Sequence, residues 1–489
     1  MTRPLIGRRP DVRIVSTPAI GALPVDVSSI DVSSIDGVVA RPGEPAFRMD
    51  GATLPRRITP PCGERPRPSH RPGAEPGGVS AVPGIDRAAV AALLGAPPFG
   101  GAASARIVHA ARWRARPAVV ACVPAKDESE RIVASLEALR RSLAGVEGTS
   151  AILVLVNNTA DDTAVRAARW AAGTDAPVLV VEARLAAAIA DAGHARRLAL
   201  DLGALLAAPD ALLLSTDADT RVAADWAGRL VGHLRAGAAA AAGMIDVEPD
   251  EFAALPARVR EVEAVERALF AEHARTWRLL VPDAPQALAL RVGGASLAVR
   301  ARSYCRVGRL PPLAASEDRA MIAAMLRHDQ RVAFDTDALI RTSCRLSARV
   351  EDGMAGMLRG RMACEDPLCD QDLYRAERFA WLCLAWRHLR DGHAGTADRR
   401  NAPPIARALG IAERVLEPQS GTTRGAAWER LLRAKGEEPR LRSSAVREEL
   451  PRARALRRAL ARIASASIDA CAEVLVDRQT AARGREDRE

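Results

Sequence analysis

The stretch Ala211-Leu212-Leu213-Leu214-Ser215-Thr216-Asp217-Ala218-Asp219 decides the fold of this chain. An unbroken apolar run of this length is typical of a strand that is covered on both faces of a sheet. Two carboxylates, Asp217 and Asp219, follow the run directly. Because open α/β sheets bind ligands at the carboxyl ends of their strands, these side chains are expected at a binding site. Paired oxygen ligands suit Mn²⁺ or Mg²⁺ with a diphosphate, although an isolated Asp-x-Asp is also typical of a solvated turn.

The composition is typical of a large globular protein with a moderate basic excess. Its 489 residues are 48% hydrophobic, which is enough to bury the cores of two or three domains. Lysine and arginine number 70 against 60 acidic residues, and residues 1–116 hold 16 arginines against 9 acids. Most of the formal net charge of +10 therefore lies near the N-terminus. Charge alone gives little reason to expect a nucleic-acid partner, and we predict none.

Cysteine usage and hydropathy predict the cellular compartment of the protein and its relation to the membrane. The 8 cysteines include no Cys-x-x-Cys pair, so a reduced, cytoplasmic environment is the simplest interpretation. No run of about 18 apolar residues occurs, and we predict no transmembrane span. Residues 254–280 carry apolar side chains at helical spacing, which favours core packing. A peripheral contact with the inner face of the membrane stays open as the alternative.

Three segments of the chain differ in pattern. Residues 1–115 are rich in Pro, Gly and Arg and are expected to form a largely disordered tail. Residues 116–350 alternate between apolar runs and helical spacing, which predicts βαβ units and a doubly wound, mainly parallel sheet. Residues 351–489 are expected to form a helical appendage. Strands are predicted at 118–123, 151–156, 178–181, 211–215, 239–246 and 332–335, with a strand pair within 284–300.

Polar loops also follow the first two predicted strands. The side chains concerned are Pro124 and Glu128 after strand 118–123, and Asn158, Asp161 and Asp162 after strand 151–156. Helix capping explains either loop by itself, because acids favour the positive end of the helix dipole. Acidic loops at the carboxyl ends of three strands predict a shared crevice instead.

These loops resemble the nucleotide-sugar half of a family 2 glycosyltransferase. The segments are Val-Pro-Ala-Lys-Asp-Glu at 123–128, Val-Asn-Asn-Thr-Ala-Asp-Asp-Thr at 156–163 and Ser-Thr-Asp-Ala-Asp-Thr at 215–220. The resemblance implies the GT-A fold and a nucleoside diphosphate sugar donor that binds with Mn²⁺ or Mg²⁺. It assigns the metal to Asp217 and Asp219. It assigns the donor to Pro124, Glu128, Asn158, Asp161, Asp162 and Asp217.

Two later motifs resemble the acceptor side of the same family. Gly293-Gly294 opens a glycine-rich segment, and Ser316-Glu317-Asp318 looks like the family's Glu-Asp motif. By this resemblance Asp318 is the general base, Glu317 lies beside it, and Gly294 lets the backbone approach the substrate. A bulge at the glycines and a capping pair of acids are the alternatives that each motif leaves open.

Two basic positions are assigned to the diphosphate in the same way. Arg197, or its neighbour Arg196, lies in a small-residue helix opening at 193–197, where a phosphate would meet a helix N-terminus. Arg345 follows a strand-like segment, and Arg349 comes four residues later. A solvated basic face is the alternative for the second pair.

The function implied is metal-dependent, inverting transfer of a sugar to a hydroxyl acceptor. In such a reaction one carboxylate takes the hydroxyl proton while the metal stabilises the departing diphosphate. The acceptor is unknown, and a lipid-linked hydroxyl is one alternative. A nucleotidyltransferase is disfavoured because the 124–128 loop has no glycine. A non-catalytic, transferase-like scaffold is disfavoured by the intact carboxylates.

Overall fold

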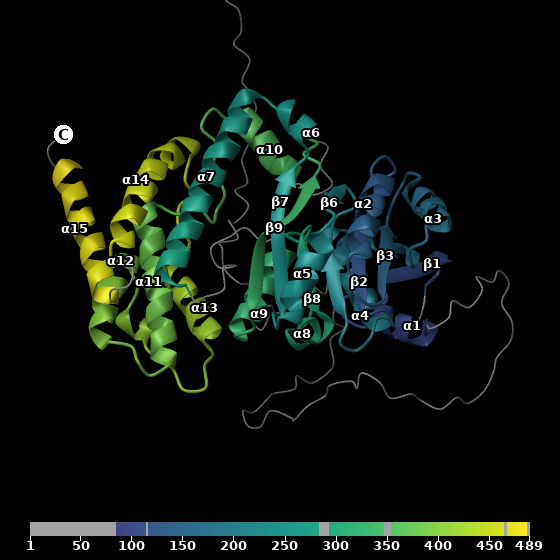
Figure 1. Ribbon diagram of the computed structural model, residues 1–489, viewed down its shortest axis with the longest axis horizontal. Coiled ribbons are helices and arrows are strands. Elements are labelled where there is room, and N and C mark those ends of the chain that lie inside the picture. Colours follow the sequence, from purple (N-terminus) through teal and green to yellow (C-terminus); the bar gives the residue numbers. More distant parts are fainter. Residues whose placement is uncertain (1–84, 114–115, 283–292, 347–353, 464–466, 487–489) are drawn as a thin grey trace, which may run out of the picture.

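The computed structural model of the protein describes residues 85–113, 116–282, 293–346, 354–463 and 467–486. One part of the molecule is a nine-stranded mixed sheet with helices on both faces, and the other is a set of packed helices (Figure 1). The α/β class, the parallel strands at the centre of the sheet and the helical C-terminal region confirm the fold predicted from the sequence.

The sheet has the strand order β1-β4-β3-β2-β5-β8-β7-β9-β6. Its strands are β1 (Ala103–Ala111), β2 (Val119–Ala125), β3 (Ser150–Asn157), β4 (Val178–Leu185), β5 (Leu212–Ser215), β6 (Thr220–Val222), β7 (Ala240–Val247), β8 (Leu297–Arg300) and β9 (Val332–Thr342). Strands β4, β3, β2 and β5 pair in parallel, as do β7 and β9. Strands β1, β6 and β8 run antiparallel to their neighbours.

The strand order reverses at β2. The chain moves outward from β2 through β3 and β4, and it then returns to add β5 on the other side of β2. The carboxyl ends of β2 and β5 therefore flank a topological switch point, which is where open α/β sheets bind ligands. The loops that carry Glu128 and Asp217 leave the sheet at this point.

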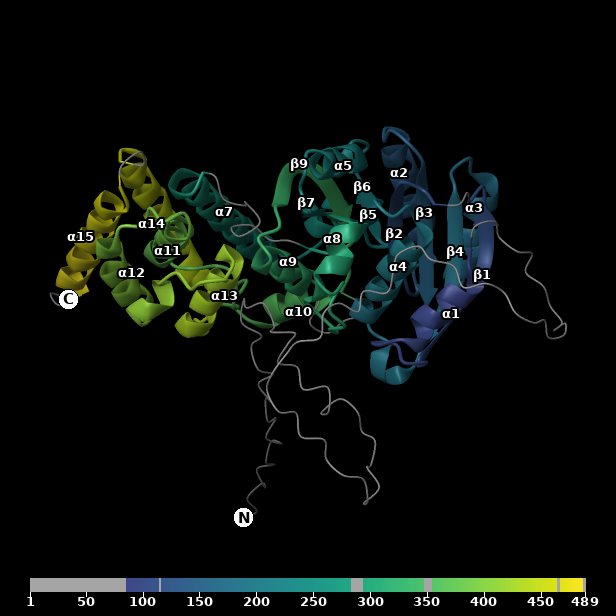
Figure 2. The ribbon, with the colours of Figure 1, turned by 90° about the horizontal axis from the view of Figure 1, so that it is seen from below.

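Helices cover both faces of the sheet (Figure 2). One face packs against α2 (Ile132–Ala144), α3 (Thr163–Gly173) and α5 (Trp226–Arg235), and the other packs against α1 (Arg87–Gly95), α4 (Ala192–Leu206), α8 (Ala301–Arg306) and α9 (Glu317–Arg327). Successive side chains of β2 alternate between the two layers, since Val119 and Ala121 join the first core and Val120 and Cys122 join the second. Burial on both faces explains why β2 reads as an unbroken apolar run.

The sheet begins earlier than the sequence predicts. Strand β1 lies inside the range 1–115 expected to be a tail, and it pairs antiparallel with β4, so that Ala103 lies opposite Leu185. Its side chains alternate between exposed and partly buried positions, and most of them are small or polar, so the hydrophobic signal of this edge strand is weak. Residues 1–84 lie outside the described chain. The strand pair predicted within 284–300 is described only in its second half, as β8.

Helix α7 (Ala257–Leu280) links the two parts of the molecule. It follows β7 in the chain, inside the range 116–350, yet it packs with α11 (Ala376–His393) and α14 (Ser443–Ala461) in the helical part (Figure 1). Leu269, Phe270 and Trp277 of α7 are buried in that core, so the apolar face of residues 254–280 is used for packing. Among the described residues, no helix is both long and apolar enough to cross a membrane.

The remaining helices complete the two parts. They are α6 (Pro249–Ala253), α10 (Met354–Ala363), α12 (Ala402–Leu409), α13 (Arg424–Lys435) and α15 (Ile468–Glu486). Helix α9 of the sheet part is tied to the helical part at both ends. Arg319 Nη1 lies 3.2 Å from Asp372 Oδ2 near its start, and Asp329 just beyond its end accepts a 2.9 Å hydrogen bond from the backbone N–H of Gly425.

His273 of α7 is a buried titratable group in the helical core. Its ring stacks on Phe379 with centroids 4.1 Å apart. Burial lowers the pKa of His273 from 6.5 to about 3, because the apolar surroundings disfavour the imidazolium. The native ring therefore stays neutral in a pH range where the unfolded chain takes up a proton.

Replacing this ring should make the helical part less sensitive to acid. The stability that neutral His273 contributes is fully present above pH 6.5 and is lost as the pH falls toward the folded pKa of about 3. Between pH 7 and pH 5 the loss should be about 2 kcal/mol. His273→Phe keeps a flat ring against Phe379 but has no group that takes up a proton. Between pH 7 and pH 5 its free energy of unfolding, measured with urea and tryptophan fluorescence, should fall by about 2 kcal/mol less than that of the unmodified protein. Equal losses in both proteins would contradict the burial argument.

Candidate active site

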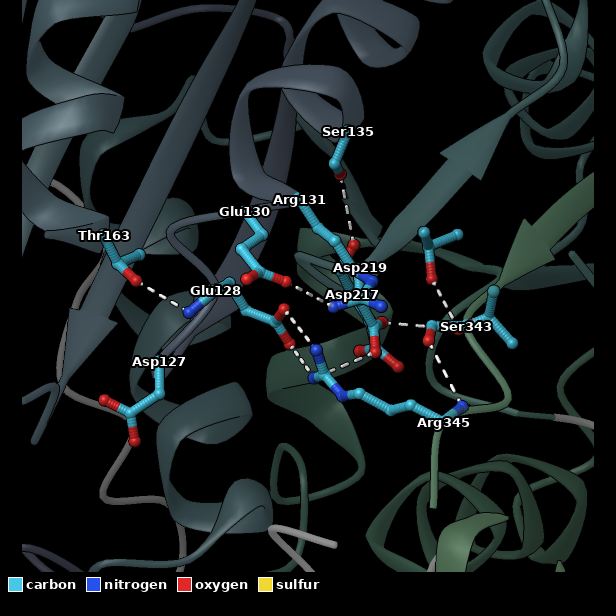
Figure 3. Close-up of polar contacts among 12 residues, drawn as sticks. Asp127, Glu128, Glu130, Arg131, Ser135, Thr163, Asp217, Asp219, Ser343 and Arg345 are labelled. Carbon is cyan, nitrogen blue, oxygen red and sulfur yellow. Dashed lines mark hydrogen bonds and ion pairs between the residues drawn. The ribbon is translucent and has the colours of Figure 1, made fainter. Parts of the chain in front are cut away.

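Arg345 joins the carboxyl ends of three strands. It lies just beyond β9, and its guanidinium forms a bidentate ion pair with Glu128, which follows β2, with Nη1 to Oε2 at 3.0 Å (Figure 3). Its Nη2 also lies 3.4 Å from Oδ2 of Asp219, which follows β5. Glu128 is 4% exposed, so its charge is almost fully removed from water. Residues 217 positions apart in the chain thus meet at the switch point of the sheet.

The backbone before Arg345 is fixed by Glu251 of α6. One oxygen of this carboxylate, Oε2, accepts hydrogen bonds from Ser343 Oγ at 2.7 Å and from the backbone N–H of Cys344 at 2.8 Å. The other, Oε1, accepts a 3.3 Å bond from Arg131. Burial opposes ionisation of Glu251, but these hydrogen bonds outweigh it and lower its pKa. The sequence offers no signal for Glu251, because neither its helix nor its partners belong to a recognisable motif.

Arg196 of α4 is the centre of a second, more deeply buried network. Its Nη2 donates to Asp217 Oδ1 at 2.8 Å and its Nε donates to Glu317 Oε1 at 3.0 Å. Its Nη1 donates to Ser215 Oγ at 3.0 Å and to the carbonyl oxygen of Gly294 at 3.1 Å. One guanidinium therefore connects the end of β5, the glycine segment before β8 and the start of α9.

Asp318 is held beside this network by two backbone donors. Its Oδ2 accepts the N–H of Gly294 at 2.5 Å, and its Oδ1 accepts the N–H of Arg319 at 2.7 Å. The neighbouring Glu317 points into the protein and pairs with Arg196. Burial raises the pKa of Glu317, while the charge of Arg196 favours its ionised form and the charge of Asp318 opposes it. The partly exposed Asp318 is therefore the acid of this pair that can meet a substrate.

The loop after β3 has a structural part in the crevice. Asn158, at φ 46°, exchanges hydrogen bonds with the backbone of Leu185 at the end of β4. Asp161 accepts the N–H of Ser129 at 3.0 Å and of Thr163 at 2.9 Å. Burial works against its charge, but these bonds and the Thr163 hydroxyl lower the pKa of Asp161. Both side chains thus brace the loops that follow β2 and β3.

Two other predicted donor-binding residues lie at the margins of this crevice. Asp162 precedes α3, is exposed, and makes no side-chain hydrogen bond to the start of that helix. Pro124 lies within β2, opposite Leu155 of β3, so the strand continues to Ala125 and does not end at the proline. The structure therefore gathers Glu128, Asp217 and Asp219 closely, and it leaves Asp162 outside their ion pairs.

Arg197 lies in a different environment from its neighbour Arg196. Its Nε donates to Asp201 Oδ2 at 2.6 Å, and its Nη1 donates to the carbonyl of Leu310. Tyr304 also donates to Asp201, at 2.7 Å. Because successive residues differ by about 100° around an α-helix, only one of the two arginines can face the switch point. The structure therefore turns Arg197 away from the switch point, and Arg196 is the arginine of the pair that lies there. Arg349 lies outside the described residues.

The oxygen ligands at the end of β5 fit a divalent cation that is shared with a substrate. Asp217 and Asp219 supply carboxylate oxygens, and Thr342 donates a 3.3 Å hydrogen bond to Asp219 Oδ1. Within the described chain, no group of three or more His, Cys, Asp or Glu side chains is arranged to hold a metal ion alone. Mg²⁺ is usually bound by one or two carboxylates together with substrate phosphates, and this donor set matches that pattern.

The solved structures that match this chain share low sequence identity and low structural similarity with it. No protein-family model matches the chain, and no curated protein matches it. A mannosyltransferase from Pyrobaculum calidifontis, in complex with GDP-Man and Mn²⁺, is 18% identical, with a TM-score of 0.34 over 77% of this chain and 91% of that chain. Glucosyl-3-phosphoglycerate synthase from Mycobacterium tuberculosis is 17% identical, with a TM-score of 0.30 over 51% of this chain and 80% of that chain. TM-scores this low establish no shared function.

Gly294→Ala should destabilise the sheet part. A Cβ at this position would lie 2.7 Å from Arg196 Nε and 2.8 Å from Arg196 Cζ, and the guanidinium cannot withdraw without breaking its four hydrogen bonds. We expect a loss of about 1–3 kcal/mol in urea unfolding, as for other overpacked sites. Gly228→Ala is the matched control, because it lies in α5 with no atom within 4 Å of an added Cβ. That variant should gain about 0.5–1 kcal/mol, so two changes of the same sign would contradict the argument.

Removing the buried cation should cost more than removing an exposed one. Arg196→Met leaves the buried Glu317 without its guanidinium, and breaking such a pair typically costs about 3–5 kcal/mol. Arg106→Met is the control, because Arg106 pairs with Glu182 on the surface, where such pairs contribute less than about 1 kcal/mol. Urea unfolding of both variants measures the difference. Equal losses would mean that the Arg196 network is not a structural centre.

Proposed function

We propose that the protein is a metal-dependent, inverting glycosyltransferase of the GT-A type. It would move a sugar from a nucleoside diphosphate donor to a hydroxyl acceptor. The observation that supports this most strongly is the meeting of Glu128, Asp217, Asp219 and Asp318 at one edge of the sheet through Arg196 and Arg345. These residues belong to separate motifs whose order resembles family 2 glycosyltransferases. Their common location is what a shared donor and acceptor site requires.

The donor fits the crevice between β2 and β5. We assign its diphosphate to Arg345, because an arginine fork suits phosphate oxygens. Asp217 and Asp219 would hold the diphosphate indirectly, through a shared metal ion. The nucleoside is assigned to the loops after β2 and β3, which Asn158 and Asp161 brace from behind. A Mn²⁺ or Mg²⁺ ion held by Asp217 and Asp219 would neutralise the charge that develops on the departing diphosphate.

Asp318 is assigned as the general base. The acceptor hydroxyl oxygen forms a bond to the anomeric carbon while Asp318 takes the hydroxyl proton, and the bond from that carbon to the diphosphate oxygen breaks. The N–H groups of Gly294 and Arg319 hold the carboxylate in position. A carboxylate offers about four lone pairs, so these two bonds leave acceptor capacity for the incoming proton. Glu317 supports the base from inside the protein by fixing Arg196, which in turn holds Gly294.

The acceptor's identity and the site of action are also part of the proposal. A cytoplasmic enzyme acting on a soluble hydroxyl compound agrees with the buried apolar face of α7. A lipid-linked alcohol presented at the inner face of the membrane is the alternative acceptor. Parallel assays with soluble and lipid-linked alcohols, read out as release of nucleoside diphosphate across a panel of nucleotide sugars, would distinguish them.

Asp318→Asn should abolish sugar transfer and leave donor binding intact. The amide keeps the side chain's size but cannot take the acceptor proton, so kcat should fall by at least about a hundredfold. Affinity for UDP or GDP with Mn²⁺, measured by calorimetry, should stay within about twofold, because Asp318 contacts the acceptor side. Asp337→Asn, an exposed acid on β9, is the control and should keep normal turnover.

Two outcomes separate this function from its rivals. Full turnover in Asp318→Asn would remove the assignment of the base. Absence of any metal-dependent affinity for UDP or GDP in the unmodified protein would instead favour the non-catalytic scaffold. Asp217→Asn and Asp219→Asn should each weaken metal-dependent nucleotide binding, because the metal would lose one of its carboxylate ligands.

A further inference from the structure

The two arginines of the site are held in different ways. Arg196 is enclosed: its side chain is 8% exposed, and its hydrogen bonds reach two carboxylates, a hydroxyl and a backbone carbonyl on three separate elements. The missing Cβ of Gly294 makes the space that it fills. A guanidinium satisfied in this way cannot leave without stranding buried acceptors. Arg196 is therefore a permanent part of the site.

Within the part of the chain that the structure describes, the side chain of Arg345 makes its polar contacts through the guanidinium at its tip. Its side chain is 19% exposed, and its guanidinium contacts the carboxylates of Glu128 and Asp219. The backbone just before it is fixed to Glu251 through Ser343 and Cys344. Rotation about the side-chain bonds of Arg345 can thus move the guanidinium while the end of β9 stays in place. The ion pair with Glu128 is the main interaction that resists this rotation.

The cluster has more carboxyl groups than guanidiniums. Glu128, Asp217, Asp219 and Glu317 pair with Arg196 and Arg345, and Asp318 lies close enough for its charge to act on Arg196. Five carboxyl groups therefore share two guanidiniums, and this excess can accommodate a divalent cation. A metal ion that arrives alone must share Asp219 with Arg345, and like charges repel at this distance. A metal ion that arrives with a diphosphate brings anionic oxygens to which Arg345 can move.

We propose that Arg345 is an exchangeable counter-ion that couples metal binding to nucleotide binding. In the free enzyme it neutralises Glu128 and Asp219, and on donor binding its guanidinium moves from these carboxylates to the diphosphate while the metal takes its place at Asp219. This inference rests on the proposed function and adds an order to it: the cation binds weakly alone and tightly with the nucleoside diphosphate. By linkage, each ligand strengthens the other by the same factor.

The test is to measure Mn²⁺ binding without any turnover. Free Mn²⁺ is followed by electron paramagnetic resonance, with and without UDP or GDP. In Arg345→Ala the affinity for Mn²⁺ alone should rise by roughly tenfold, because a competing positive charge is gone. Affinity for the nucleoside diphosphate at saturating Mn²⁺ should fall by a similar factor, because the fork on the diphosphate is lost. The two effects have opposite signs, which loss of folding or simple damage to the site would not produce.

Three further variants sharpen the comparison. Arg345→Gln keeps a hydrogen-bond donor for the buried Glu128 and carries the same prediction if Arg345→Ala fails to fold. Arg345→Lys keeps the charge and should leave the affinity for Mn²⁺ alone within about twofold of the unmodified protein. Arg221→Ala removes a charge two residues from Asp219, but Arg221 pairs with Glu248 at 2.8 Å, so it should not change Mn²⁺ binding.

The possible results separate this proposal from the proposed function. If the unmodified protein binds Mn²⁺ and nucleoside diphosphate with strong synergy, and that synergy falls in Arg345→Ala or Arg345→Gln, the counter-ion role is supported. If the synergy persists unchanged in both variants, or if Mn²⁺ alone binds less tightly in them, the counter-ion role is overturned while the transferase assignment stands. If the unmodified protein binds no nucleoside diphosphate with Mn²⁺, both proposals fail.

Discussion

The geometry of the site depends on the buried guanidinium of Arg196. A buried charge is tolerated only when it is paired and its donors are satisfied, and here the acceptors come from β5, from the segment before β8 and from α9. Moving any one of these elements would strand a donor. The same bonds set the distance between Asp217 and Asp318, because Arg196 contacts the first directly and reaches the second through the peptide of Gly294. The proposed metal side and the proposed acceptor side are thus positioned by one residue.

The sequence predicts the central strands well and the details of the site less well. Strands β2, β3, β4, β5 and β7 are buried on both faces, so their apolar runs identify them. Edge strand β1 has small and polar residues, and its pairing with β4 depends on a partner distant in the chain. The choice between Arg196 and Arg197 depends on the rotation of α4 about its axis, which the sequence does not reveal because this helix is buried nearly all round. Glu251 reaches Ser343 and Cys344 only through the folded arrangement of α6 and β9.

The motifs after the strands also have two kinds of role that the sequence does not separate. Acids at strand ends serve either as ligands or as braces, and both kinds occupy the same positions in a pattern. Asp161 accepts hydrogen bonds from backbone N–H groups of its own loop and of the neighbouring loop. Glu128 instead pairs with Arg345, which follows β9, a strand four positions away from β2 in the sheet. Only the hydrogen-bond partners in the folded structure show which acids are engaged with nearby backbone N–H groups. Helix α9 adds a further dependence, since the helical part holds it near both of its ends.

The path of α7 makes the two parts of the molecule inseparable. The chain leaves the sheet after β7, contributes α7 to the helical core, and then returns to place β8 between β5 and β7. A shortened protein that stopped after β9 would keep every strand of the sheet but would leave Leu269, Phe270 and Trp277 in water. The C-terminal region is therefore not an optional attachment. Any chain that places α7 between β7 and β8 also needs helices that cover the apolar face of α7.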